Sequence, residues 1–140
     1  MTYGCFDVDV TDKVAHLQMK RPESFNSMVP AFWTELPEIV RELDAQGEAR
    51  AIVLSSTGKH FTAGMDLAVF GAGGEGQEAG EGQARKTERG RARAEMRRRI
   101  LHLQESFSCL DRARMPVLAA IQGGCIGCLL YTSPSPRDRG

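Results

Sequence analysis

Two short glycine-containing segments each follow an apolar run, and their residue types suit the binding of a polarised oxygen atom. The first glycine turn is residues 61–64 (Phe-Thr-Ala-Gly), after the run 50–56, and the second is residues 123–127 (Gly-Gly-Cys-Ile-Gly), after the run 117–121. Small residues let backbone N–H groups approach a ligand. Two N–H groups aimed at one point form an oxyanion hole, in which losing one donor costs roughly 10²–10³ in rate in a known enzyme. A tight connection between elements is the simpler interpretation of either turn.

The elements that must position these turns include several short strands. Strands are predicted at 3–8 and 12–19, the second from its alternation of apolar and polar residues, and a hairpin turn at residues 11–12 joins them. The runs 50–56 and 117–121 are typical of buried strands. Because a helix between parallel strands forms a crossover unit, the sequence predicts an α/β fold.

Two helices are predicted between these strands. One spans about residues 29–45, with Ser27 as its cap and Pro30 in its first turn. Pro37 is expected to kink this helix or to delay its start. The other helix spans about residues 84–113 and carries an apolar stripe at intervals of three and four residues: Met96, Ile100, Leu103, Phe107 and Leu110.

The overall composition excludes several classes of function. The chain has 140 residues, 41% of them hydrophobic, and Lys+Arg and Asp+Glu both number 18, so the formal net charge is zero. A nucleic-acid binder needs a cationic surplus, so no nucleic-acid partner is expected. No apolar run approaches the roughly 20 residues of a membrane span, so no membrane partner is expected either. Residues 1–7 do not resemble a targeting peptide, and we expect a cytoplasmic protein.

Three sequence blocks occur in a fixed order along the chain. They are Arg21-Pro22-x-x-x-Asn26-x-Met28, residues 61–67 (Phe-Thr-Ala-Gly-Met-Asp-Leu) and residues 116–127 (Pro-Val-Leu-Ala-Ala-Ile-Gln-Gly-Gly-Cys-Ile-Gly). Together they resemble the crotonase family of enoyl-CoA hydratases and isomerases, and they are most similar to its Δ(3,5)-Δ(2,4)-dienoyl-CoA isomerase branch. The resemblance implies the N-terminal part of a spiral fold of repeated ββα units, with a mixed or parallel sheet covered by helices.

The resemblance also implies an acyl-CoA thioester as substrate. The implied reaction is hydration or isomerisation of an enoyl- or dienoyl-CoA, as in fatty-acid β-oxidation, with an oxyanion hole stabilising the thioester enolate. Ala63 would supply one N–H of that hole. The second donor position falls on Cys128, where the family has the middle glycine of a Gly-Gly-Gly run, and a β-carbon there would crowd the thioester. The residues expected to line the substrate channel are Ala63, Gly64, Met65, Asp66, Leu67 and Gly127.

Further expectations follow from the same resemblance. No metal and no separate cofactor is implied, because coenzyme A is part of the substrate. Full-length members form a trimer or a pair of trimers. Family members transfer protons with carboxylates, but the first such position falls on Tyr131. No catalytic acid is therefore assigned, and a truncated, non-catalytic chain is the alternative.

The C-terminal residues depart from the family pattern. Residues 128–140 have alternating prolines and no periodicity, so we expect a partial acyl-CoA binding domain at 1–127 followed by a disordered tail that is not native to it. If later turns of the repeat are missing, the strand 117–121 is expected to present an open edge.

Three other motifs have simpler interpretations than a functional site. Cys125-x-x-Cys128 has the spacing of a thiol pair, but no second pair accompanies it. Gly71-x-Gly73-x-x-Gly76 matches a dinucleotide fingerprint but does not follow a strand, so residues 71–82 are predicted to form a flexible loop. The run 97–99 (Arg-Arg-Arg) is interpreted as a solvated helix face, with attraction for the phosphates of CoA as the alternative.

Overall fold

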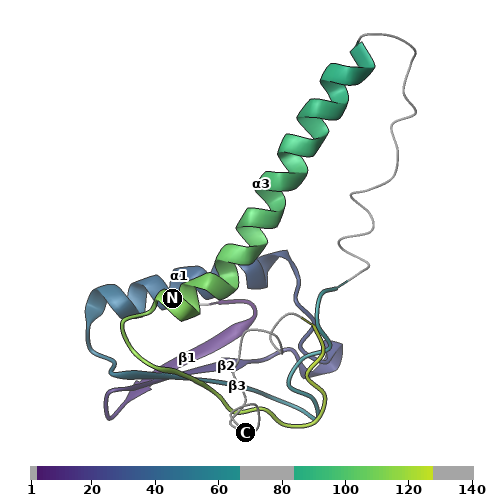
Figure 1. Cartoon of the computed structure of the whole chain (residues 1–140). Coiled ribbons are helices and arrows are strands. Elements are labelled where there is room, and N and C mark those ends of the chain that lie inside the picture. The colour runs from purple at the N-terminus through teal and green to yellow at the C-terminus, as the bar shows by residue number, and fades with distance from the viewer. Residues whose placement is uncertain (1–2, 67–83, 128–140) are drawn as a thin grey trace, which may run out of the picture.

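The computed structural model describes residues 3–66 and 84–127, which form a four-stranded mixed sheet with helices on one face (Figure 1). The sheet order is β1-β2-β3-β4, where the first two strands are antiparallel and the last three are parallel. The strands are β1 (Phe6–Thr11), β2 (Val14–Met19), β3 (Ala51–Ser56) and β4 (Val117–Ala119). The predicted α/β class and mixed sheet with covering helices are confirmed.

The β1–β2 hairpin turns at Asp12 and Lys13, one residue later than the predicted turn. Both residues have positive φ, 50° and 66°. A two-residue hairpin turn of this kind needs positive φ at both central positions, because only then does its twist match that of the strands. The first strand begins at Phe6, three residues later than predicted.

Helix α1 (Pro30–Gln46) begins where its first proline sets the backbone. Its N-cap is Val29, which makes no side-chain capping bond. The predicted cap at Ser27 is wrong, because the Ser27 hydroxyl donates to the Asp66 carboxylate at 3.3 Å instead. Proline at the first position has no N–H to satisfy, so the helix start needs one donor fewer. Pro37 lies inside the helix without delaying its start.

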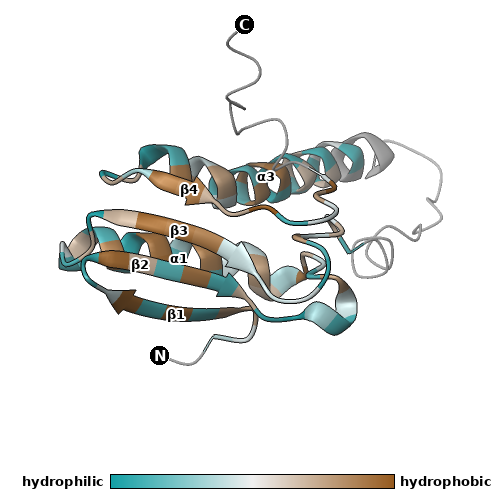
Figure 2. Cartoon of the chain, turned by 90° about the horizontal axis from the view of Figure 1, so that it is seen from below, coloured by the Kyte–Doolittle hydropathy of each residue, from teal (hydrophilic) through white to brown (hydrophobic). Residues whose placement is uncertain are grey.

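The hydrophobic core lies between α1 and the covered face of the sheet. In the view from below, the helices lie behind the strands, and the opposite face of the sheet points toward the viewer (Figure 2). Fully burying a Leu, Ile or Phe side chain contributes roughly 1.5–3 kcal/mol. The side chains that fill this layer are less than 3% exposed and include Ala15, Leu17, Ile52 and Leu54 from the sheet and Phe32, Trp33, Leu36 and Ile39 from α1.

Helix α3 (Ala84–Arg112) packs on α1 only along its C-terminal part and projects beyond the sheet (Figure 1). The predicted apolar stripe divides at the same place. Leu103, Phe107 and Leu110 pack against the core, whereas Met96 and Ile100 are 58% and 46% exposed. The periodicity therefore located the helix but overestimated the length of its buried face.

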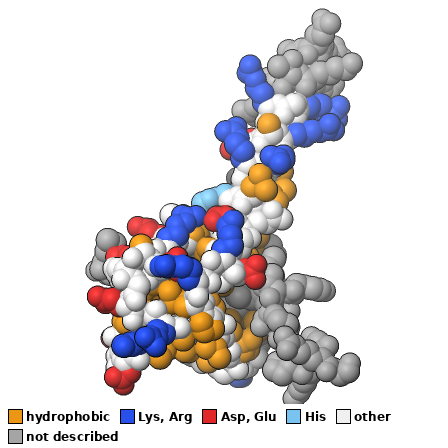
Figure 3. Space-filling model, turned by 60° about the vertical axis from the view of Figure 1, so that its left-hand side comes forward, with side chains coloured by type: hydrophobic (Ala, Val, Ile, Leu, Met, Phe, Trp, Pro, Cys, Tyr) orange, Lys and Arg blue, Asp and Glu red, His pale blue; other side chains and the backbone are white. Residues whose placement is uncertain are grey.

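The projecting part of α3 is strongly basic. Figure 3 shows Lys and Arg side chains on the visible sides of this arm. The exposed arginines along it are Arg89, Arg91, Arg93, Arg97, Arg98 and Arg99. This agrees with the interpretation of the run 97–99 as a solvated face.

Strand β4 is shorter and more exposed than predicted. It spans three residues instead of the predicted 117–121 and forms one edge of the described sheet. Leu118 is 55% exposed and Ile121 is 48% exposed. The prediction of a buried strand is therefore wrong for the described residues, because no described element covers its outer face. The expected open edge is present in residues 3–66 and 84–127. The predicted loop 71–82 and the predicted tail 128–140 lie outside the described residues.

Candidate functional site

The two glycine turns lie side by side at the carboxyl ends of β3 and β4 (Figures 1 and 2). A parallel bridge pairs Thr62 with Cys125. The Phe61 N–H donates to the Gly124 carbonyl at 2.9 Å, and the Ile126 N–H donates to the Thr62 carbonyl at 3.0 Å. Because the carboxyl ends of parallel strands share one edge of the sheet, segments distant in sequence meet there.

Glycine is required where the turns touch. Gly64 has a φ of +86°, and a Cβ built on it would lie 2.8 Å from the Ile126 carbonyl oxygen. Gly127 has a φ of +105°, and its Cβ would lie 3.3 Å from the Gly64 Cα atom. Residues with a Cβ atom rarely adopt this backbone conformation. With glycine at both positions, the two backbones face each other directly. The two turns therefore approach each other through backbone, and the prediction that Gly64 and Gly127 line a substrate channel stays a prediction.

Two buried polar side chains fix the first glycine turn from inside. The Thr62 hydroxyl, fully buried, donates to the Asn26 carbonyl at 2.8 Å and accepts the Gly64 N–H at 3.1 Å. The Asn26 amide donates to the carbonyls of Thr57 at 2.8 Å and His60 at 3.2 Å. These bonds satisfy the polar groups on the buried side of the turn.

Asn26 was part of a sequence block, but no role was predicted for it. Its φ is +52°, in the left-handed region that asparagine tolerates better than most residues. An asparagine that follows the Arg21-Pro22 turn is a signal that could have indicated this role, because asparagine side chains commonly bond to nearby backbone in turns.

Ala63, the predicted oxyanion donor, is exposed, but its N–H is already bonded. It donates to the Phe25 carbonyl at 2.9 Å. Phe25 has a φ of +50°, and its side chain is 55% exposed. A ligand oxygen at the Ala63 N–H would have to displace or share this carbonyl. The role of Ala63 stays a prediction, and the competing Phe25 carbonyl is a feature that the sequence did not reveal.

The remaining predicted site residues divide into described and undescribed ones. Met65 forms a parallel bridge with Met28, directly after Gly64. Asp66 holds the Ser27 hydroxyl, as described above. Leu67 and Cys128 lie outside the described residues. The structure therefore brings Ala63, Gly64 and Gly127 together, and the second donor at position 128 stays a prediction.

The histidine before the first turn was missed by sequence reasoning. The His60 Nδ1 atom accepts the Gly124 N–H at 2.9 Å. No local pattern could have shown this bond, because the two residues are 64 positions apart. Next to it, burial raises the pKa of the Cys125 thiol, so this thiol stays protonated at neutral pH. Among the described residues, no group of three or more His, Cys, Asp or Glu side chains is placed to hold a metal ion.

Sequence comparison matches most of the chain to one family. Residues 9–130 match the family described as Enoyl-CoA hydratase/isomerase. The chain is 39% identical over 114 residues to the mitochondrial Δ(3,5)-Δ(2,4)-dienoyl-CoA isomerase of Mus musculus. It is 34% identical over 114 residues to the peroxisomal protein of the same name from Arabidopsis thaliana. These alignments cover 81% of this chain but only 33% and 39% of the two relatives, so the chain spans well under half of their length.

Comparison with solved structures gives the same fold. A putative enoyl-CoA hydratase/isomerase (crotonase) from Legionella pneumophila superposes with a TM-score of 0.67 at 24% identity, covering 85% of this chain and 40% of that one. A putative enoyl-CoA hydratase/isomerase from Mycobacterium abscessus has a TM-score of 0.64 at 28% identity, covering 87% and 42%. By its sequence blocks, its sheet and these matches, the chain belongs to the enoyl-CoA hydratase/isomerase family.

Proposed function

We propose that the two glycine turns form part of an acyl-CoA thioester site in an enzyme that hydrates or isomerises enoyl- or dienoyl-CoA. The observation that carries this proposal is the backbone-to-backbone approach of Gly64 and Gly127 beside the exposed Ala63. Family membership supports it, as do relatives that are named dienoyl-CoA isomerases. Because the chain spans only part of the length of those relatives, its reaction is proposed here and not inferred from their names.

The Phe25 carbonyl gives this proposal a chemical consequence. The thioester oxygen gains negative charge as an enolate forms, and an N–H bonded to a charged oxygen makes a bond about twice as strong as one to a neutral oxygen. The neutral Phe25 carbonyl, bonded to the Ala63 N–H at 2.9 Å, would therefore be displaced more readily by the enolate than by the ground-state thioester. Such differential binding is what lowers a reaction barrier.

Binding of a saturated acyl-CoA tests the proposal without chemistry. Isothermal titration of the purified chain with octanoyl-CoA should show binding. Ala63→Pro removes the N–H donor. Because the ground-state thioester oxygen is neutral, losing one hydrogen bond worth about 0.5–1.5 kcal/mol should weaken binding about two- to tenfold, whereas Ala63→Ser keeps the donor and should bind as the unchanged chain does. Circular dichroism checks that both variants fold. A chain that binds no octanoyl-CoA, or binds equally well with Pro at position 63, would contradict the proposal.

A second candidate function is thioester binding without turnover. The carboxylate that lies nearest to Ala63 in the sequence is Asp66, and it is engaged with the Ser27 hydroxyl. Proton transfer needs an acid or base at the reacting carbon. Turnover of crotonyl-CoA by the purified chain would rule this candidate out. The loss of enoyl absorbance measures that turnover. Binding without turnover would support it.

Assembly and location are proposals of the same kind. We propose a homotrimer or a pair of trimers for the full-length protein, which light scattering during size exclusion would measure.

We propose a cytoplasmic location, although the names of two relatives place those proteins in mitochondria and peroxisomes, and cell fractionation would decide between them. No helix in residues 3–66 and 84–127 is long and apolar enough to cross a membrane. The arm of α3 projects beyond the sheet (Figure 1), and we propose no contact between its arginines and CoA.

A further inference from the structure

We propose that His60 is a positioning residue, whose Nδ1 atom holds the second glycine turn against the first and so sets the spacing between the two turns of the thioester site. The reference to a thioester rests on the function proposed above. His60 directly precedes the first glycine turn and accepts the Gly124 N–H at 2.9 Å. A Cβ built on Gly124 would lie 3.1 Å from the same Nδ1 atom. The imidazole ring is thus in close contact with the backbone of the second turn.

The direction of this hydrogen bond fixes the state of the ring. Because the Gly124 amide donates, the His60 Nδ1 atom must be without a proton. A neutral imidazole then carries its proton on Nε2. His60 therefore acts here as an acceptor for backbone.

The position of His60 is itself fixed from two sides. Its carbonyl accepts the Asn26 amide at 3.2 Å and the Ser56 hydroxyl at 3.3 Å. Its ring meets the Phe25 ring edge-on, with centroids 5.7 Å apart. Phe25 also supplies the carbonyl bonded to Ala63 N–H. One histidine thus connects the first turn, the second turn and the segment that competes for the predicted oxyanion donor.

The neighbouring bonds show what His60 adds. Before Gly124, the Gln122 amide donates to the Ser56 carbonyl at 2.8 Å, and after it the Ile126 N–H donates to the Thr62 carbonyl at 3.0 Å. The Gly124 N–H lies between these two anchors. Without the imidazole acceptor this N–H would have to turn toward water, which would loosen the turn that ends at Gly127.

Two substitutions separate the acceptor from the size of the side chain. His60→Asn places an amide oxygen near the position of Nδ1, whereas His60→Gln places it near Nε2. His60→Gln should raise the hydrogen-exchange rate of the Ile126 amide about tenfold, because the turn opens more often, and His60→Asn should restore a rate close to that of the unchanged chain. His102→Asn, on the exposed side of α3, is the matched control and should change nothing. An unchanged Ile126 rate in His60→Gln, or equal rates in both His60 variants, would overturn the proposal.

Nuclear magnetic resonance of the unchanged chain provides a check that needs no variant. The ring nitrogen shifts of His60 should show an unprotonated, hydrogen-bonded Nδ1, and a protonated Nδ1 would overturn the proposal. Titration with octanoyl-CoA then separates this inference from the proposed function. If the unchanged chain binds, His60→Gln should weaken binding and His60→Asn should retain it, and equal binding by both would overturn the positioning role. If the unchanged chain does not bind, the proposed function fails, and the exchange rates still decide whether His60 positions the turn.

Discussion

Single glycines lie where the two turns touch. Gly64 combines a positive φ with a neighbour that leaves no room for a side chain, whereas Gly47, at the end of α1, combines a positive φ of 69° with open space. The two positions therefore separate the cost of backbone conformation from the cost of crowding.

Gly64→Ala should destabilise the chain more than Gly47→Ala. Both variants place a Cβ in the left-handed region, which costs about 1–2 kcal/mol, but only the alanine at 64 would also meet the Ile126 carbonyl oxygen at 2.8 Å. The free energy of unfolding, measured by urea denaturation, should fall by at least about 1 kcal/mol more for the variant at 64. Equal losses for the two variants would mean that the turns can separate freely.

At this scale the sequence predicted the proximity of the two turns, whereas the binding roles of their residues stay predictions. Ala63, Gly64 and Gly127 were expected at one place, because each follows a strand and lacks a large side chain, and the structure brings them together. The contacts of Phe25 and His60 were not predicted. They join a carbonyl or a ring to backbone far away in the chain, and such pairs leave no periodic or compositional signal.

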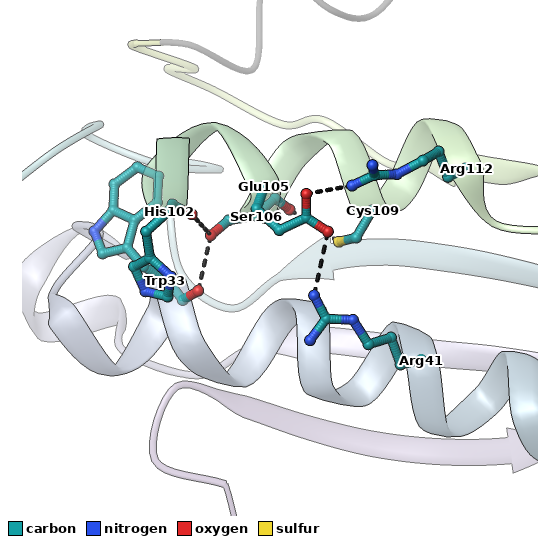
Figure 4. Close-up of polar contacts among 7 residues, drawn as sticks. All are labelled: Trp33, Arg41, His102, Glu105, Ser106, Cys109 and Arg112. Atoms are coloured by element: carbon teal, nitrogen blue, oxygen red, sulfur yellow. Dashed lines mark hydrogen bonds and ion pairs between the residues drawn. The ribbon is translucent and has the colours of Figure 1, made fainter. Parts of the chain in front are cut away.

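At the scale of elements, a bond between α1 and α3 explains how a proline is accommodated within a helix. Proline has no N–H, so Pro37 cannot donate to the carbonyl one turn earlier, that of Trp33. The buried Ser106 hydroxyl on α3 donates to this carbonyl at 2.8 Å (Figure 4). The α3 side chain thus replaces the donor that α1 lacks. The sequence pointed to disruption at Pro37, because a partner 73 residues away could not be read from it.

Replacing Ser106 tests this account. Ser106→Ala should lower the free energy of unfolding by about 1–3 kcal/mol, because a buried carbonyl loses its donor. In a Pro37→Ala background the same change should cost clearly less, because residue 37 then supplies an N–H. Urea denaturation of the four chains gives the coupling between the two sites. Additive effects would show that the hydroxyl does not substitute for the missing donor.

An exposed cluster of ion pairs on the same two helices provides the control for the Ser106 prediction. Glu105 bridges Arg112 on its own helix and Arg41 on α1 (Figure 4). The Arg112 guanidinium, and to a smaller extent that of Arg41, holds the pKa of this carboxyl below its usual range. The stabilisation is therefore present at neutral pH and is lost as the pH falls through the lowered pKa. Because exposed ion pairs contribute little, Glu105→Gln should cost less than Ser106→Ala, and its small effect should disappear in acid.

At the scale of the whole molecule, β1 and β4 form the two edges of the described sheet, and the described helices leave one of its faces open. The edge strand β4 carries Leu118, 55% exposed, and is followed by Ile121, 48% exposed. An exposed apolar edge is a template for pairing with another chain. Composition and periodicity predicted the class and the order of elements but overestimated the burial of β4, because burial depends on which element covers a strand.

Leu118→Lys should reduce self-association of the purified chain. A lysine on an edge strand opposes edge-to-edge pairing. Met96→Lys is the control, because Met96 is similarly exposed, at 58%, but lies on the arm of α3. Light scattering over a range of concentrations should show a lower apparent mass only for the variant in β4. If the variant on the arm has the same effect, association does not depend on the sheet edge.

The bond between His60 and Gly124 joins residues 64 positions apart, and this has a consequence for the order in which the chain acquires its structure. The β1–β2 hairpin closes over a two-residue turn and can form early, but the two glycine turns can meet only after a long loop has closed, which is slow. During synthesis the first turn leaves the ribosome well before its partner exists. The contacts of the site should therefore be among the last to form and, under denaturing stress, among the first to separate.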